Sequence, residues 1–156
     1  MGRRKKKEKR DMNPDPKYSN LTVAKFINHI MSEGKKNTAR RVVYDTFEKI
    51  EERTKKDALD IFDQAIKNVT PSLEVKSKRV GGANYQVPVM VRADRKLTLA
   101  MRWILDAAKK KKGKSMPEKL SMELLDAANN TGTAIKKKTD TYRMAEANRA
   151  FSHFVR

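Results

Sequence analysis

The chain has 156 residues, enough for one domain with its own hydrophobic core, and 36% of them are charged. Lys and Arg number 37 against 19 Asp and Glu, so the formal net charge is +18. With no cysteine, disulfide frames, thiolate zinc clusters and cysteine nucleophiles are excluded. No apolar run approaches the ~20 residues of a spanning helix, and no apolar stretch follows the charged N-terminus as in a secretory signal. We therefore expect a cytoplasmic protein without membrane contact.

The first 17 residues lack an apolar period and include Pro14 and Pro16. Such a segment cannot bury enough apolar surface to fold alone. We therefore expect a basic, extended N-terminal arm over residues 1–17 that is disordered when free and orders on its partner. A helical domain is expected over residues 18–156.

Apolar residues at helical spacing predict three helices between residues 20 and 70. The first begins at a cap on Ser19 or Asn20 and ends at Gly34, the second begins at Asn37, and the third begins at Asp57. The residues expected to face inward are Val23, Phe26, Ile27, Ile30, Met31, Ala39, Val42, Val43, Phe47, Ile50, Ala58, Ile61, Phe62, Ala65, Ile66 and Val69.

After residue 72 the helical spacing of apolar residues ends, and apolar residues alternate with polar ones as in a β-strand. Two alternating runs on either side of Gly81 and Gly82 predict a β-hairpin at about 72–92. Because two strands alone are only marginally stable, the near end of the hairpin is expected to pack on the helices. The far end carries Lys78 and Arg79 with few apolar residues, so we expect it to project and meet a partner.

Three more helices are predicted to begin near Asp94, Ser115 and Thr133, the second with a capping box between Ser115 and Glu118. The apolar tail over 150–156 is expected either to pack back on the chain or to dock on a neighbour. The predicted fold is therefore mainly α, a single domain of about six helices with a projecting β-hairpin and the basic arm.

The positive charge is concentrated in four segments. Residues 1–17 carry a net +5, 74–96 a net +4, 109–119 a net +5 and 135–143 a net +3, whereas the other 96 residues are nearly neutral. A concentrated positive field attracts a polyanion, and nucleic acid is the leading candidate. An anionic membrane surface and a merely solubilising surface are the alternatives.

No catalytic, metal or cofactor site is apparent in the sequence. Neither His29 nor His153 has the neighbours of a ligand set or a general base. The Gly113-Lys114-Ser115 triplet lacks the earlier glycine of a phosphate-binding loop and follows a helix rather than a strand. We therefore expect no enzymatic activity. Tyr85 is the one aromatic residue considered for base stacking.

Several strings resemble a known family over nearly the whole chain. They are Pro14-Asp15-Pro16-Lys17, Val23-Ala24-Lys25-Phe26-Ile27-Asn28, Gly34-Lys35-Lys36, the hairpin from Val75 to Val89, Ala100-Met101-Arg102-Trp103-Ile104, Lys114-Ser115-Met116, Gly132-Thr133-Ala134, Lys136-Lys137-Lys138 and Tyr142 to Phe151. The chain is similar to the seventh protein of the small ribosomal subunit, in its bacterial form.

This resemblance implies a structural protein that binds small-subunit (16S) rRNA directly, in the 3′ major domain, and nucleates folding of the subunit head. It implies a place at the subunit interface, with the hairpin near the exit-site tRNA and the mRNA path. The ninth and eleventh small-subunit proteins would be its neighbours. Some bacterial members also bind their own operon mRNA and repress its translation.

The expected RNA contacts come from the resemblance and from charge. By resemblance they are Arg3, Arg4, Lys9, Arg10, Lys35, Lys36, Lys76, Lys78, Arg79, Arg92, Arg95, Lys96, Lys114 and Met116. Charge adds Lys5, Lys6, Lys7, Lys109, Lys110, Lys112, Lys136, Lys137, Lys138 and Arg143. By resemblance, the end from Arg143 to Phe154 would face protein neighbours and mRNA. A DNA-compacting protein is the alternative function, and a peripheral membrane protein fits less well because the basic segments lie mostly in loops and a hairpin.

Overall fold

Six α-helices and one 3-10 helix build most of the structure, a computed structural model that describes residues 12–155. In chain order the elements are α1 (Leu21–Ile30), α2 (Lys36–Thr54), α3 (Ala58–Val69), β1 (Leu73–Val80), β2 (Ala83–Met90), α4 (Ala93–Lys110), α5 (Met116–Ala128), α6 (Gly132–Ala147) and the 3-10 helix η1 (Arg149–Val155). The mainly α prediction with one hairpin is confirmed.

Two predicted helix caps form as expected. The side chain of Asn20 accepts hydrogen bonds from the backbone N–H groups of Thr22, at 2.7 Å, and Val23, at 3.3 Å. Asp57 accepts one from the N–H of Leu59 at 2.8 Å. These bonds satisfy amide groups that have no partner inside the first turn of a helix.

Two other predicted capping interactions do not form among the described residues. Helix α2 begins one residue before Asn37, after Lys35, whose side chain makes no capping bond in the described structure. Within residues 12–155 the Ser115 side chain makes no capping bond either, so the predicted box with Glu118 does not form. Glu118 instead lies 3.7 Å from the Nζ atom of Lys49 on α2. This ion pair joins α5 to α2.

The hydrophobic core lies among α1 to α5, with part of α6. The rings of Phe26, Phe47 and Phe62 are fully buried, and the centroid of Phe62 lies 5.2 Å from that of Phe26 and 5.5 Å from that of Phe47. These three rings bring α1, α2 and α3 together. Trp103 is buried on α4, as expected for a core residue rather than a stacking platform.

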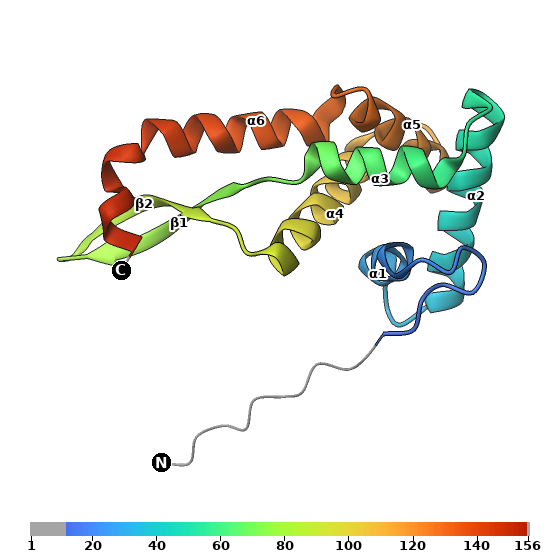
Figure 1. Cartoon of the computed structure of the whole chain (residues 1–156), viewed down its shortest axis with the longest axis horizontal. Coiled ribbons are helices and arrows are strands. Elements are labelled where there is room, and N and C mark those ends of the chain that lie inside the picture. The colour runs from blue at the N-terminus through green and yellow to red at the C-terminus, as the bar shows by residue number, and fades with distance from the viewer. Residues whose placement is uncertain (1–11, 156) are drawn as a thin grey trace, which may run out of the picture.

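The hairpin extends away from the helical body, and α6 runs beside it (Figure 1). Its strands pair antiparallel from Leu73 opposite Met90 to Val80 opposite Ala83, with a two-residue turn between them. The glycines of that turn have φ angles of +56° and +90°. Both values lie in the region that glycine adopts without strain, which explains the Gly-Gly pair.

The hairpin projects as expected, and the chain terminus supports it near its far end (Figure 1). η1 folds back across β2 (Figure 1). The ring of Tyr85 lies 5.2 Å from that of Phe151 and 5.1 Å from that of Phe154. Of the two alternatives for the apolar tail, packing back on the chain is therefore the one observed.

The predicted arm enters the described structure at residue 12. Asp15 is buried, with 3% of its surface exposed. Its carboxylate accepts hydrogen bonds from the Tyr44 hydroxyl at 3.0 and 2.9 Å and from the N–H of Lys17 at 3.1 Å. These contacts attach the start of the described chain to α2.

Candidate nucleic-acid interface

The structure divides the predicted hairpin cations into paired and unpaired side chains. Lys76 lies 3.0 Å from Glu74, and the Nζ atom of Lys78 donates to the carbonyl oxygen of Phe154 at 2.6 Å. Arg79 is exposed, and no carboxylate of the described chain pairs with it. Arg79 is therefore the hairpin cation best placed to bind phosphate.

A buried carboxylate joins the root of the hairpin to α4. Glu74 is 7% exposed, and both of its oxygens accept from the Nε–H of Arg95, at 2.9 and 2.7 Å. Burial raises the pKa of Glu74, but the hydrogen bonds from Arg95 and Lys76 outweigh it, so the pKa of this carboxyl lies below its usual value. Arg95 and Lys76 thus stabilise the fold, whereas Arg92 and Lys96 nearby have no carboxylate partner among residues 12–155.

The lysine run between α4 and α5 contains one structural residue. Lys111 lies 2.9 Å from Glu123, which is fully buried, and 3.0 Å from Asp126. Burial lowers the pKa of Lys111, but its bonds to the two carboxylates raise it further, above the usual value. The other oxygen of Glu123 accepts from the N–H of Ala134 at 2.9 Å. Lys111 therefore ties this loop to the start of α6.

The neighbours of Lys111 remain exposed. They are Lys109, Lys110, Lys112 and Lys114. In the described chain only Lys114 among them has a side-chain contact, at 3.4 Å from the sulfur of Met122. Met116, a further predicted contact, opens α5 and is half-buried against the core.

Three successive lysines on α6 have different surroundings. Lys137 lies 3.7 Å from Asp106 and 5.9 Å from the centre of the Trp103 ring. Lys138 donates to the carbonyl oxygen of Asn68 at 2.7 Å. Lys136 is exposed and has no ion pair within residues 12–155.

A hollow of about 280 Å³ brings together two basic segments that lie far apart in the sequence. It is lined by Lys110 from α4 and by Lys136 and Lys137 from α6. Asp106 and Asp140 also line it, so the charge there is mixed. The structure thereby joins the lysine run after α4 to the lysines of α6 in one region.

The turn between α1 and α2 presents Lys35 and Lys36. Gly34 has a φ angle of +74°, which permits this turn. Lys35 lies 2.7 Å from Glu33, in an exposed pair of little energetic value. Lys36 is exposed and has no ion pair in the described chain.

Most of the predicted contacts that the structure describes are available to a ligand. Nine of them form neither an ion pair nor a side-chain hydrogen bond with residues 12–155: Lys36, Arg79, Arg92, Lys96, Lys109, Lys110, Lys112, Lys136 and Arg143. All are exposed except Lys96, which is half-buried. The predicted arm contacts Arg3, Arg4, Lys5, Lys6, Lys7, Lys9 and Arg10 lie outside the described residues.

Other classes of site find no support in the described residues. No group of three or more metal-ligating side chains occurs among them. No helix in this part of the chain is long and apolar enough to cross a membrane. Tyr85, the aromatic residue considered for base stacking, is in contact with the two phenylalanines of η1. The sequence signal for that contact was the apolar character of the tail over 150–156.

The comparison with known families decides between a ribosomal protein, a DNA-compacting protein and a peripheral membrane protein. Residues 2–149 match the family model described as ribosomal protein S7p/S5e. The chain belongs to this family. Members of the S7p/S5e family are ribosomal proteins, so this chain is a structural, non-enzymatic constituent of the small ribosomal subunit. The resemblance seen in the sequence is confirmed.

Bacterial S7p/S5e relatives match over nearly their full length. The small ribosomal subunit protein uS7 of Thermotoga maritima is 57% identical over 152 residues, which cover 97% of this chain and 98% of the relative. That of Anaeromyxobacter sp. is 54% identical over 154 residues, 99% of both chains. That of Desulfitobacterium hafniense is 57% identical over 146 residues, 94% of both.

Proposed function

We propose that this S7p/S5e protein is a primary rRNA-binding protein of the small subunit. It binds the 3′ major domain of 16S rRNA, nucleates assembly of the subunit head and supports translation. The observation that carries the proposal is the set of nine cations that have neither an ion pair nor a side-chain hydrogen bond in the described chain. They lie at the start of α2, on the hairpin, at both ends of α4, in the α4–α5 loop and on α6.

The distribution of these cations over several helices and the hairpin suits a protein that holds RNA segments together. Phosphate contacts from lysine and arginine position a protein on RNA but carry no sequence information, so specificity comes from the shape of a folded junction. Cations on elements held rigidly by one core match the phosphates of a single RNA fold better than those of an unrelated one.

The proposal extends to the neighbours of the protein. The hairpin lies near the exit-site tRNA and the mRNA path at the subunit interface. The end of the chain from Arg143 to Phe154 faces mRNA and the ninth and eleventh small-subunit proteins. The operon mRNA is a further RNA ligand, bound by the same basic surface. In this proposal the protein acts in the cytoplasm, within the ribosome.

A competition assay tests the proposal. A labelled 3′-domain fragment of 16S rRNA is bound to the full chain at physiological salt and competed with duplex DNA or an unrelated folded RNA. We expect the unlabelled rRNA fragment to displace the label at far lower concentration than either competitor. Equal displacement by all three would indicate a general polyanion binder, such as a DNA-compacting protein, and the proposal would be withdrawn.

A further inference from the structure

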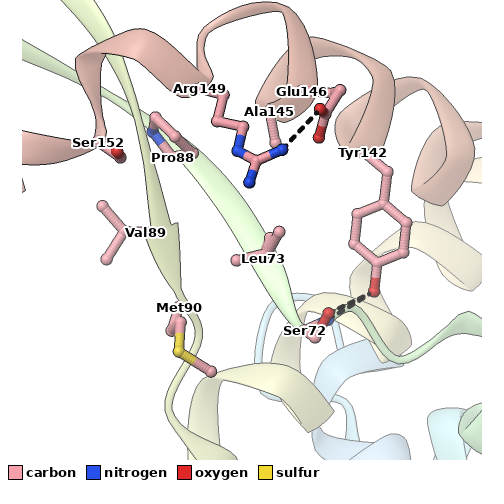
Figure 2. A pocket seen from close by; sticks show the side chains of 10 residues that line it. All are labelled: Ser72, Leu73, Pro88, Val89, Met90, Tyr142, Ala145, Glu146, Arg149 and Ser152. Carbon is pink, nitrogen blue, oxygen red and sulfur yellow. Dashed lines mark hydrogen bonds and ion pairs between the residues drawn. The ribbon is translucent and has the colours of Figure 1, made fainter.

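A hollow lies on the surface between the root of the hairpin and the C-terminal helices. Its volume is about 890 Å³ (Figure 2). Leu73 from β1 and Pro88 and Met90 from β2 form one wall, while Tyr142 and Arg149 from α6 and η1 form the other. In Figure 2 the Arg149 side chain extends into the space above Leu73.

The walls of this hollow are apolar, and residues 12–155 cover them incompletely. Met90 is 76% exposed, although methionine is an apolar residue, and Leu73 and Pro88 are only half-buried. A contiguous apolar surface left open on a folded domain marks a binding site for an apolar group. Such walls accept a protein side chain or the face of a nucleobase equally well.

The charges around the hollow favour the nucleobase. Arg149 lines it, and the Nζ atom of Lys138 lies 5.8 Å from the centre of the Tyr142 ring. The carboxylate that lines the hollow is Glu146, which pairs with Arg149 at 3.4 Å in a fully solvated contact of little strength. Cations next to apolar walls suit a ligand that has both a flat apolar face and a phosphate.

The Tyr142 hydroxyl also responds to this positive field. It hydrogen-bonds to Ser72 at 2.8 Å, both to the backbone N–H and to the hydroxyl. Burial raises the pKa of Tyr142, but the bonds with Ser72 and the charges of Lys138 and Lys96 outweigh burial and lower it. An anionic group at this rim would therefore be stabilised.

We propose that the hollow binds an unpaired nucleobase of single-stranded RNA. The base lies against Leu73, Pro88 and Met90, the planar guanidinium of Arg149 stacks on it, and its phosphate faces Lys138. Unstacked bases are commonly held in this way, on aromatic or guanidinium planes. The inference rests on the proposed function, because the RNA partner supplies the base.

The test uses a short single-stranded RNA with 2-aminopurine at its centre, together with the same RNA carrying an abasic residue there. Binding to the full chain is followed by 2-aminopurine fluorescence and by the NMR signals of ¹³C-labelled methionine methyl groups. We expect the Met90 signal to move with the 2-aminopurine RNA and to stay in place with the abasic RNA. Met144 is also exposed, at 52%, but does not line the hollow, so its signal serves as the internal control.

Variants separate stacking from charge. Arg149→Lys keeps the positive charge but removes the planar guanidinium that stacks on the base. Met90→Ser removes an apolar side chain from the wall. Each variant should weaken binding of the 2-aminopurine RNA about tenfold. Met144→Ser, the matched control, should bind as the wild type does. Circular dichroism serves as the control that all three variants fold.

Other occupants give other results. Equal affinity for the base-containing and abasic RNAs, or an equal Met90 shift with inorganic phosphate, would show that only phosphate binds there and would overturn the inference. A Met90 shift with a leucine-rich peptide but not with RNA would assign the hollow to a protein partner and would also overturn it. The 3′-domain rRNA fragment is titrated in parallel. If that fragment binds while Met90 does not respond, only this inference fails; if the fragment does not bind, the proposed function fails.

Discussion

The adjacent residues Lys111 and Lys112 belong to the same lysine run but have different roles in this chain. Lys111 is held by Glu123 and Asp126, whereas Lys112 beside it is exposed and forms no ion pair with the described residues. The difference arises because α4 ends at Lys110, which turns the next side chain toward α5. One residue of the run therefore stabilises the fold and the others remain available to RNA.

Replacing each of these two lysines by alanine should separate stability from RNA binding. Lys111→Ala leaves the Glu123 carboxylate buried without its cation, and we expect a loss of about 3 kcal/mol in the free energy of unfolding. Lys112→Ala should change that free energy by less than about 0.5 kcal/mol but weaken rRNA binding. Urea unfolding and filter binding measure the two effects. Equal stability of the two variants would contradict the structural role of Lys111.

The carboxylate at the hairpin root predicts a pH dependence. The pKa of Glu74 is lower in the folded chain than its ordinary value of 4.5. Its contribution to stability is therefore complete above about pH 4.5 and is lost as the pH falls through the lower folded value. We expect Glu74→Gln to be less stable than the wild type at pH 7. As the pH is lowered below 5, the variant should lose less stability than the wild type does.

The variant Lys76→Met is a second test of how the Glu74 carboxylate contributes to stability. It removes one of the two cations that favour the ionised form, so the acid-induced loss should shrink but not vanish. Urea unfolding at a series of pH values measures all three proteins. An identical acid loss in the wild type and in Glu74→Gln would show that this carboxylate does not stabilise the hairpin root.

At the scale of elements, the hairpin depends on the chain terminus. Two strands alone are marginally stable in water, and here Tyr85 on β2 packs against Phe151 and Phe154 on η1. The hydrogen bond from Lys78 to the carbonyl oxygen of Phe154 adds a polar link at the same place. The C-terminal segment thus fixes the direction of the hairpin relative to α6.

This support should be measurable as coupling between Tyr85 and Phe154. Because aromatic pairs contribute about 0.5–1.5 kcal/mol beyond their buried area, Tyr85→Ala and Phe154→Ala should be non-additive by about that amount. Amide exchange in β1 and β2 should accelerate in either variant while exchange in α2 and α3 stays unchanged. Additive effects on stability, with unchanged exchange in the strands, would indicate that η1 does not support the hairpin.

Much of the fold is predictable because local rules agree with it. Alternation around a Gly-Gly pair predicted the hairpin, and Asn20 and Asp57 marked the starts of two helices. The capping box at Ser115 failed because Glu118 is used in a contact with α2 that local sequence does not show. The contact between Tyr85 and η1 was missed for the same reason, since two segments about 70 residues apart must meet in space.

The candidate site was predictable in composition but not in arrangement. Clustered charge identified the basic segments, yet no pattern distinguishes Lys111 from Lys112 or shows that Glu74 neutralises Arg95. Which cation is paired depends on the position of a carboxylate from another element. The grouping of Lys110 with Lys136 around one hollow likewise follows only from the packing of α4 against α6.

On the scale of the whole molecule, separate elements present cations that one core holds in fixed positions. If each binds a phosphate, the RNA complex should lose affinity with salt in proportion to the number of phosphates neutralised. Arg79, Lys112 and Lys136 come from the hairpin, the α4–α5 loop and α6, and they have no ion pair in the described structure. Their contributions to the salt dependence should therefore be nearly additive.

A triple variant tests this additivity. Changing Arg79, Lys112 and Lys136 to glutamine should reduce the slope of log affinity against log salt for the 3′-domain rRNA fragment by about two, because each phosphate contact contributes roughly 0.7–0.9. A control triple variant at Arg53, Lys56 and Lys67, exposed cations outside the four basic segments, removes the same charge. Its slope should stay close to that of the wild type. An equal reduction in both variants would mean that the RNA responds to the net charge of the protein, and the three chosen residues would then have no special contact with phosphate.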